Sequence, residues 1–236
     1  DPRLPRAVAA LSRLPPAAAA GTEAAIRAAP DRFFALLAEA EAESAAAGGL
    51  LQLVDKNHAL PAGYEPADLA SLDGSPLRAT KSGMKLRKAI MGAALAMHEA
   101  AEADGVRLTF ASAYRSYDYQ DGLFKRYAAA HGEAEASRFS ARAGTSQHQL
   151  GTAFDMDPID DAFAATPAGA WMAANAWRFG FSLSYPAGME SVTGYVWESW
   201  HYRYVTKPGA VLEREWFGGV QQYLMEFLDA YGNGGG

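Results

Sequence analysis

The clearest pattern of hydrophobic and polar positions lies in residues 82–105. Apolar residues recur there at the spacing that places them on one side of a helix, with lysine, arginine and glutamate on another side. Gly105 ends the stretch, and a glycine directly after a periodic segment commonly marks the end of a helix. The pattern therefore predicts an amphipathic helix over residues 82–105, with its apolar side formed by Met84, Ile90, Leu95 and Met97.

Other segments are shorter, and those rich in β-branched and aromatic residues are typical of strands. Strands are predicted within residues 50–61, 106–115, 152–157, 181–186 and 191–205, the last with a turn at Gly194. Helices are predicted over residues 117–132, 168–180 and 211–232, and a loop over residues 136–151. Because these helices and strands alternate irregularly, we expect an α+β fold with a small, mainly antiparallel sheet.

The first 48 residues differ from the rest because they are rich in alanine and interrupted by prolines. Two short helices are predicted here, one over residues 22–29 with Thr22 as its N-cap and one over residues 31–47 capped by Asp31. The glycine pair at residues 48–49 ends this region. We therefore expect three parts, namely a helical leader (1–48), a main domain (49–232) and a flexible tail (233–236).

Composition narrows the possible functions. With 236 residues, half of them hydrophobic and a fifth charged, the chain fits one globular domain with a helical extension. A formal net charge of −6 argues against a nucleic-acid-binding surface, which requires a basic face. No run approaches the roughly 18 consecutive apolar residues that span a bilayer. The absence of cysteine excludes disulfide bonds and thiolate zinc sites.

The segment "SQHQLGTAFDMD" (residues 146–157) concentrates potential metal ligands. It combines His148, one of only five histidines in the chain, with the carboxylates of Asp155 and Asp157. A catalytic zinc site usually has three His, Asp or Glu ligands and one open position, so another histidine must come from elsewhere. In an extended segment both aspartates point to the same side, so spacing alone leaves both of them eligible.

Four other histidines are candidates for the third ligand. His98, in the predicted amphipathic helix, and His131, at a helix end, are interpreted as ordinary core or surface residues, and His58 in a loop is ambiguous. His201 stands in "WESWHYRYV", three residues after Glu198. A zinc hydrolase needs a carboxylate beside the metal as general base, and Glu and His between tryptophans are unfavourable in a core unless they are paired.

These two segments resemble the S-x-H-x-x-G-x-A-x-D and E-x-W-H patterns of the zinc D-alanyl-D-alanine carboxypeptidase family, peptidase family M15. Within that family, whose fold is hedgehog/DD-peptidase-like, the chain is most similar to VanY-like and LdcB-like enzymes, which trim the stem peptides of bacterial peptidoglycan. The resemblance covers roughly residues 50–205 and includes "SAYRSYDYQ" and "RFGFSLSYP". Every fixed position is present: Ser146, His148, Gly151, Ala153, Asp155, Glu198, Trp200 and His201.

The resemblance implies that Zn²⁺ is the cofactor, with His148, Asp155 and His201 as its ligands, and that Glu198 is the general base. Asp157 is then left as a partner that orients a histidine or holds the chain beyond it. Side chains three residues apart on a regular strand point to opposite faces. Glu198 and His201 can therefore share a site only if a turn or bulge interrupts the strand between them, and we predict that interruption.

Three further residues are assigned to the substrate by the same resemblance. Arg115 is expected near the scissile carbonyl and the terminal carboxylate of the peptide, where its guanidinium suits an oxyanion. The alternative for Arg115 is a surface ion pair. Gln120 and Ser146 are expected to donate or accept hydrogen bonds at the peptide end, although Ser146 could instead cap its own loop.

The implied function is a metallo-carboxypeptidase that hydrolyses the C-terminal D-alanine of peptidoglycan stem peptides, with L,D specificity, D,D specificity and release of a D-alanyl-D-alanine dipeptide all left open. The alternative is a non-catalytic, zinc-containing cell-wall-binding module, which would have no need of Glu198 or Arg115. The acidic stretch of residues 156–170 is expected to rim the site and to favour substrates with a free amine. We expect a monomer that acts outside the cytoplasm, in the periplasm or cell envelope, with the leader as a possible spacer to a membrane tether.

Overall fold

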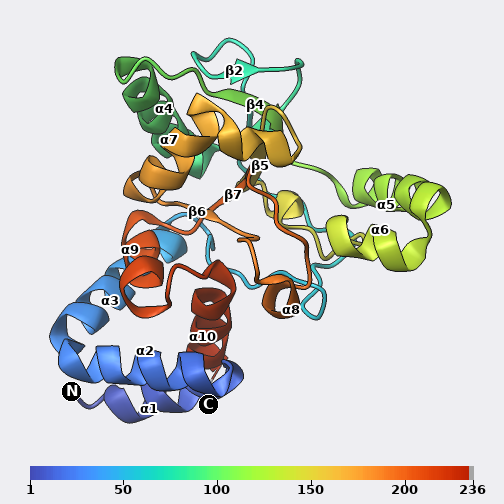
Figure 1. Ribbon diagram of the computed structural model, residues 1–236. Helices are drawn as coiled ribbons and strands as arrows, with labels where there is room; N and C mark the ends of the chain where they lie inside the picture. The colour runs from blue at the N-terminus through green and yellow to red at the C-terminus, as the bar shows by residue number, and fades with distance from the viewer. Residues whose placement is uncertain (234–236) are drawn as a thin grey trace.

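The computed structural model describes residues 1–233 and is built around a five-stranded sheet (Figure 1). The strands lie in the order β2–β4–β5–β7–β6. β2 and β4 run parallel, and every other neighbouring pair is antiparallel, which confirms the predicted mainly antiparallel sheet. The strands are β2 (Arg78–Ala79), β4 (Thr109–Ser112), β5 (Ala153–Met156), β6 (Phe181–Leu183) and β7 (His201–Tyr204).

The two inner strands β5 and β7 are buried along their whole length. Their antiparallel register sets Asp155 directly opposite His201. On its other side, Asp155 pairs with Ser112 of β4, next to an irregularity in the β4–β5 register. A carboxylate and an imidazole thus lie side by side inside the sheet, where burial is unfavourable unless both groups have partners.

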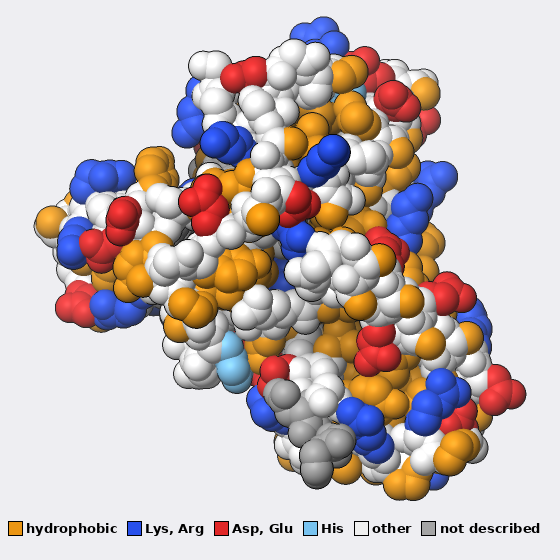
Figure 2. Space-filling model, turned by 180° about the vertical axis from the view of Figure 1, so that it is seen from behind, with side chains coloured by type: hydrophobic (Ala, Val, Ile, Leu, Met, Phe, Trp, Pro, Cys, Tyr) orange, Lys and Arg blue, Asp and Glu red, His pale blue; other side chains and the backbone are white. Residues whose placement is uncertain are grey.

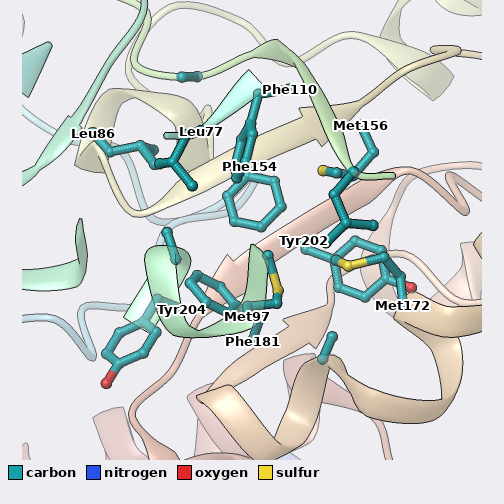
Figure 3. Packing of buried hydrophobic residues seen from close by; sticks show 14 of the residues in the cluster. Leu77, Leu86, Met97, Phe110, Phe154, Met156, Met172, Phe181, Tyr202 and Tyr204 are labelled. Atoms are coloured by element: carbon teal, nitrogen blue, oxygen red, sulfur yellow. The ribbon is translucent and has the colours of Figure 1, made fainter. Parts of the chain in front are cut away.

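The main hydrophobic core lies between the sheet and two helices, α4 (Lys88–Ala103) and α7 (Pro167–Asn175). Figure 3 shows its centre, where the ring of Phe154 packs against neighbours from both sides of β5. The Phe154 ring centroid lies 4.8 Å from that of Phe110 and 5.1 Å from that of Phe181. Met97 of α4 and Met172 of α7 belong to the same cluster. This packing holds β4, β5 and β6 rigidly and so fixes the residues at their ends.

A second core joins the two ends of the chain. The N-terminal helices α1 (Leu4–Ala10), α2 (Pro16–Ala28) and α3 (Pro30–Ala46) pack with the C-terminal helices α9 (Lys207–Trp216) and α10 (Gln221–Asn233), as Figure 1 shows. The ring centroid of Phe33 lies 5.6 Å from that of Trp216 and 5.7 Å from that of Phe227. The leader is therefore tightly packed against the C-terminal helices. None of the helices within residues 1–233 is both long and apolar enough to cross a membrane.

Helices α5 (Tyr117–His131) and α6 (Glu133–Phe139) form a lobe that projects from the sheet. Figure 2, which views the molecule from behind, shows this lobe with acidic and basic side chains interspersed. Ion pairs such as Lys125–Asp121 and Arg138–Glu135 account for this mixture. The remaining elements are a two-stranded pair, β1 (Leu69–Ser71) with β3 (Lys85–Arg87), helix α8 (Glu190–Thr193), and the 3₁₀ turns η1 (Leu11–Arg13), η2 (Gln147–Leu150), η3 (Asp161–Ala165) and η4 (Ala176–Phe179).

Several predicted boundaries are wrong. Residues 50–61 are irregular rather than a strand, and the helix predicted over 82–105 begins at Lys88 because residues 85–87 pair with β1. The segment 136–151, predicted as a loop, contains the end of α6 and the turn η2. The helix predicted over 211–232 is two helices, because Gly218 and Gly219 both adopt positive φ, which breaks a right-handed helix.

The predicted N-terminal caps of the first helices are also wrong. Thr22 lies in the middle of α2, where its buried hydroxyl donates a hydrogen bond to the carbonyl of Trp216. Pro16 begins α2 instead, since proline is tolerated in the first turn of a helix. Asp31 lies in the first turn of α3, one residue inside its start at Pro30. The tail predicted for residues 233–236 falls, apart from the end of α10, outside the described residues.

Candidate active site

The structure brings together the three residues predicted to hold a metal. His148 comes from η2, Asp155 from β5 and His201 from the start of β7, and one ligand atom of each lies within 4.8 Å of the others. Gly151 makes the turn from η2 into β5 with a φ of +67°, and a Cβ there would lie 3.0 Å from the side chain of Arg87. This glycine therefore allows the chain to carry His148 back beside Asp155.

Hydrogen bonds define which ring nitrogen of each histidine is free. His148 Nδ1 lies 2.7 Å from the carbonyl oxygen of Ala113, which can only accept, so Nδ1 carries the proton. The buried Nε2 atom of His148 has no hydrogen-bond partner and lies 3.2 Å from Asp155 Oδ2. An imidazole nitrogen with a lone pair, buried and without a donor, is the arrangement that a metal ligand requires.

Both ring nitrogens of His201 have side-chain partners. Its Nε2 atom lies 3.2 Å from the amide oxygen of Gln147, and its Nδ1 atom lies 3.0 Å from Asp155 Oδ1. The ring of His201 stands nearly perpendicular to that of His148, with centroids 4.8 Å apart. Both histidines thus direct one nitrogen toward the carboxylate of Asp155, and the three side chains form a buried set of two nitrogen donors and a carboxylate.

The electrostatics of the cluster favour the protonation states in which His148 and Asp155 bind metal. Burial and the adjacent guanidinium of Arg115 lower the pKa of His148 to about 4, so its imidazole is neutral near pH 7. Burial alone would raise the pKa of Asp155, but His148 and Arg115 outweigh it and hold that pKa well below its ordinary value. Neutral imidazoles and an ionised carboxylate are the usual protein ligands of a catalytic zinc ion, so the donor set fits that metal.

Glu198 lies beside this cluster because the chain turns immediately before β7. The backbone N–H of His201 donates a 3.1 Å hydrogen bond to the carbonyl of Glu198, which closes a turn over residues 198–201. Glu198 Oε2 consequently lies 3.6 Å from His201 Nδ1. The predicted interruption of the strand is thereby confirmed. Burial, reinforced by the nearby negative charge of Asp155, raises the pKa of Glu198 well above its usual value.

Arg115 connects the cluster to the cavity in front of it. Its Nη2 atom donates a 2.5 Å hydrogen bond to Asp155 Oδ2, and its Nε atom donates to Ser112 Oγ at 3.0 Å. Arg115 follows β4 and lines the cavity with a side chain that is 18 % exposed. The ion pair of Arg115 is therefore with a buried residue of the site and not with a surface acid.

Gln120 and Ser146 occupy different positions relative to the cavity. Gln120 is buried behind Arg115: its amide oxygen accepts a 3.4 Å hydrogen bond from Arg115 Nη1, and its amide nitrogen donates to the carbonyl of Ala141. It is not among the residues that line the cavity. Ser146 does line the cavity, and its hydroxyl also caps η2 by accepting a hydrogen bond from the N–H of His148.

The cavity itself has a volume of about 930 Å³, and its walls carry both aromatic and acidic side chains. At its base lie His148, Asp155, Glu198 and His201. Its aromatic wall is made by Tyr127, Phe139, Tyr185, Tyr195, Trp197 and Trp200. Asp160 and Asp161, from the acidic stretch after β5, lie at its rim. A cavity of this size, with convergent polar groups at one end, suits a short peptide.

Sequence reasoning missed the residues that orient the two histidines. Gln147 is adjacent to His148 in the motif but was given no role, and the carbonyl of Ala113 could not be recognised because a backbone oxygen leaves no sequence signal. Asp157, the expected orienting residue, is exposed beyond the end of β5. Tyr185 was also missed, although its ring lies 4.8 Å from that of His201.

The other histidines lie elsewhere in the fold. His98 is buried in α4 and lies 3.7 Å from Glu102, and His131 is exposed at the end of α5. His58 Nδ1 lies 2.8 Å from Asp55 Oδ1, and these two residues form a separate group of potential metal ligands with Glu226 of α10. His201 is therefore the histidine that completes the cluster around His148 and Asp155.

The chain is similar to known proteins in both sequence and fold. Residues 83–207 match the family model VanY, D-alanyl-D-alanine carboxypeptidase. The protein YodJ of Bacillus subtilis is 38 % identical over 168 residues, a match that covers 68 % of this chain and 62 % of YodJ. The chain thus spans less than two thirds of the length of this curated relative.

Solved structures give the same result. The LdcB LD-carboxypeptidase, described as revealing the basis of peptidoglycan recognition, superposes with a TM-score of 0.69 and 33 % identity over 78 % of this chain and 87 % of that chain. The vancomycin-resistance D,D-pentapeptidase VanY in complex with Zn(II) superposes with a TM-score of 0.62 and 31 % identity over 76 % of this chain and 98 % of that one. A further structure of VanYB contains D-alanine-D-alanine. The zinc D,D-peptidase fold predicted from the motifs is therefore confirmed.

Proposed function

The chain belongs to the VanY family of D-alanyl-D-alanine carboxypeptidases, and we propose that it is a zinc-dependent carboxypeptidase that removes the C-terminal D-alanine of peptidoglycan stem peptides. One observation carries the proposal. The imidazoles of His148 and His201 and the carboxylate of Asp155 converge at the base of a peptide-sized cavity, with the Glu198 carboxylate 3.6 Å from the His201 imidazole.

Zinc would be held by His148 through Nε2, His201 through Nδ1 and the carboxylate of Asp155. The orphaned Nε2 atom of His148 supports this choice, because a buried nitrogen with a lone pair and no donor is costly unless it binds a cation. When bound, zinc supplies a Lewis acid that polarises a carbonyl and increases the acidity of water.

Glu198 acts as the general base in this proposal. It accepts a proton from the attacking water, whose oxygen bonds to the scissile carbonyl carbon. As the C–N bond breaks, Glu198 delivers that proton to the nitrogen of the departing D-amino acid. The raised pKa of Glu198 supports the role, because a carboxylate whose pKa is raised by burial is a stronger base toward the attacking water.

Arg115 stabilises negative charge on the substrate, either on the carbonyl oxygen during attack or on the terminal carboxylate. Its hydrogen bonds to Ser112 and Gln120 hold the guanidinium in place. Gln120 therefore acts through Arg115 as a positioning residue, and its direct contact with substrate stays a prediction. Ser146 lines the cavity and can bond the peptide end while it caps η2.

In this proposal the acidic rim of the cavity favours stem peptides that carry a free side-chain amine. Asp160 and Asp161 lie at the rim, and Asp160 already caps η3 through a 2.8 Å hydrogen bond from the N–H of Ala162. Asp161 is the carboxylate proposed to attract a free amine on the side chain of a stem-peptide diamino acid. Since such peptides lie outside the cytoplasm of bacteria, we place the activity in the periplasm or cell envelope.

The test is mass spectrometry of defined tetra- and pentapeptide stems after incubation with the protein, with a chelator, and with zinc restored. Loss of one D-alanine that is abolished by the chelator and restored by zinc supports the proposal. Tight zinc binding without any release from either peptide would instead favour a non-catalytic cell-wall-binding module. The length of the peptide that is cleaved distinguishes L,D from D,D specificity.

A further inference from the structure

A chain of buried amide side chains runs from His201 to the C-terminal helix. Gln147 accepts from His201 Nε2 at 3.2 Å, and the Gln147 amide nitrogen donates to the amide oxygen of Gln221 at 3.1 Å. The Gln221 amide nitrogen in turn donates to the backbone carbonyl of Ser182 at 3.3 Å. Gln147 and Gln221 are 5 % and 1 % exposed, so water does not compete with these contacts.

The direction of every hydrogen bond in this chain is determined from its far end. The Ser182 carbonyl can only accept, so Gln221 must direct its amide nitrogen toward it and its amide oxygen toward Gln147. Gln147 must then present its amide nitrogen to Gln221, which leaves its amide oxygen for His201. An oxygen at that position requires a proton on His201 Nε2 and leaves Nδ1 as the metal-binding nitrogen.

A hydroxyl group reinforces the same orientation. Ser184 Oγ lies 2.7 Å from the amide oxygen of Gln147, and Ser184 as a whole is only 2 % exposed. The Gln147 oxygen thus faces two donors, His201 and Ser184, and the Ser184 hydroxyl lies farther, at 3.3 Å, from the amide oxygen of Gln221. If Gln147 were rotated to present its amide nitrogen, it would face His201 with a donor and lose the bond from Ser184.

We propose that Gln147 and Gln221 are positioning residues that fix the metal-binding tautomer of His201, and that helix α10 is thereby part of the metal site. Gln221 is the first residue of α10 and lies outside residues 83–207, the part of the chain that matches the family model. Helix α10 is anchored in the second core by Leu224, Met225 and Phe227. The helical unit formed by the two chain ends therefore supports His201 through a specific polar contact as well as through packing.

The inference rests on the proposed function, because it requires His201 to be a zinc ligand. Its test is the zinc dissociation constant, measured by competition with a chelator, for the wild type and for Gln147→Leu and Gln221→Leu. Loss of a group that orients a metal-binding histidine commonly weakens metal binding by about 10- to 100-fold, and we expect losses in that range. The double variant should bind zinc no more weakly than Gln147→Leu alone, because Gln221 acts only through Gln147.

The matched control is Gln222→Leu. Gln222 is the next residue of α10 and also makes partly buried side-chain hydrogen bonds, but to Asp55 and Glu226 rather than to Gln147. We expect its zinc affinity to stay within about 3-fold of the wild type, well short of the usual cost of losing an orienting group. In Gln221→Glu, a neutral carboxylic acid can donate and accept in the same directions as the amide, and it should recover most of the affinity.

A second measurement uses the unaltered protein. In the ¹⁵N spectrum of the zinc-loaded wild type, His201 should carry its proton on Nε2 and have no proton on Nδ1. A proton on Nδ1, or Gln221→Leu no weaker in zinc binding than Gln222→Leu, would overturn the inference and leave the proposed function intact. A wild type that binds no zinc would overturn the proposed function and the inference with it.

Discussion

The carboxylate of Glu198 and the Nδ1 atom of His201 lie 3.6 Å apart, although the two residues are separated by three positions at the start of a strand. A regular strand would direct side chains three residues apart to opposite faces. The turn closed by the Glu198 carbonyl and the His201 N–H removes that constraint, and β7 begins only at His201. The segment "ESWH" thus supplies a base and a ligand to one site, opposite Asp155 of β5.

Asp155 and Asp157 provide a direct test of the ligand assignment. Asp155 is buried between both histidines, whereas Asp157 is exposed beyond the end of β5. We expect Asp155→Ala to weaken zinc binding by more than about 100-fold, the upper range for the loss of an outer partner, because a ligand itself is removed. Asp157→Ala serves as the control and should keep the zinc affinity of the wild type. Equal zinc affinities of the two variants, measured by chelator competition, would refute the assignment.

Arg115 is expected to affect catalysis more than binding of the metal. Arg115→Ala should lower kcat/KM by about 100- to 1,000-fold, the usual cost of removing a group that stabilises developing negative charge. Arg115→Lys should recover only a small part, since an ammonium cannot reproduce the bonds of the guanidinium to Asp155 and Ser112. The measurement is steady-state kinetics on variants with confirmed zinc content. Wild-type kcat/KM in Arg115→Ala would show that the residue is only structural.

The buried carboxyl of Glu213 should make the protein less stable as the pH rises. Burial raises the pKa of this α9 carboxyl to about 7, above its value of 4.5 in the unfolded chain. The folded state therefore holds the proton more tightly, and the free energy of unfolding falls as pH rises from about 4.5 to about 7. Glu213→Gln should be more stable than the wild type at pH 8, by up to about 3 kcal/mol, and nearly equal to it at pH 4.5.

Urea unfolding at both pH values measures this difference. The comparison between the two proteins cancels the titration of every group that they share. If the difference in unfolding free energy between Glu213→Gln and the wild type were the same at pH 4.5 and pH 8, the pKa of Glu213 would not be raised in the folded protein.

Asp161 tests the proposed preference for a free amine. We expect the wild type to cleave stems with a free side-chain amine faster than stems in which that amine is acetylated. Asp161→Asn should reduce this preference by a few-fold, about the size of a rim charge effect, and more so at low salt than at high salt. Equal rates on both stems with the wild type would remove the acidic rim from the account of specificity.

Much of the site could be predicted from the sequence because its ligands fall in two short motifs. His148 and Asp155 are joined by the turn at Gly151, and Glu198 and His201 by a four-residue turn, so local spacing already constrains each half. The fold class followed from the irregular alternation of helices and strands. The pairing of β5 with β7 brings the two halves together. This long-range contact cannot be derived from local spacing, and only the family resemblance implied that the two motifs share one site.

The parts that could not be predicted depend on tertiary contacts. The local sequence favours Thr22 as a helix cap, but its hydroxyl instead donates to the carbonyl of Trp216, nearly 200 residues later. Residues 85–87 satisfy a helical pattern and yet pair with β1, because strand pairing outweighs a weak propensity. Gln221 has no local motif at all, and its link to the site exists only because the chain ends pack on each other.

The most direct test of the account is D-alanine release by Glu198→Ala compared with the wild type, each loaded with one zinc ion per chain. Glu198 lies beside the proposed ligands but is not one of them, so its removal should leave zinc bound. The account predicts that release from the preferred stem peptide falls by at least about 100-fold, the usual contribution of a general base. Release by the zinc-replete variant at the rate of the wild type would contradict it.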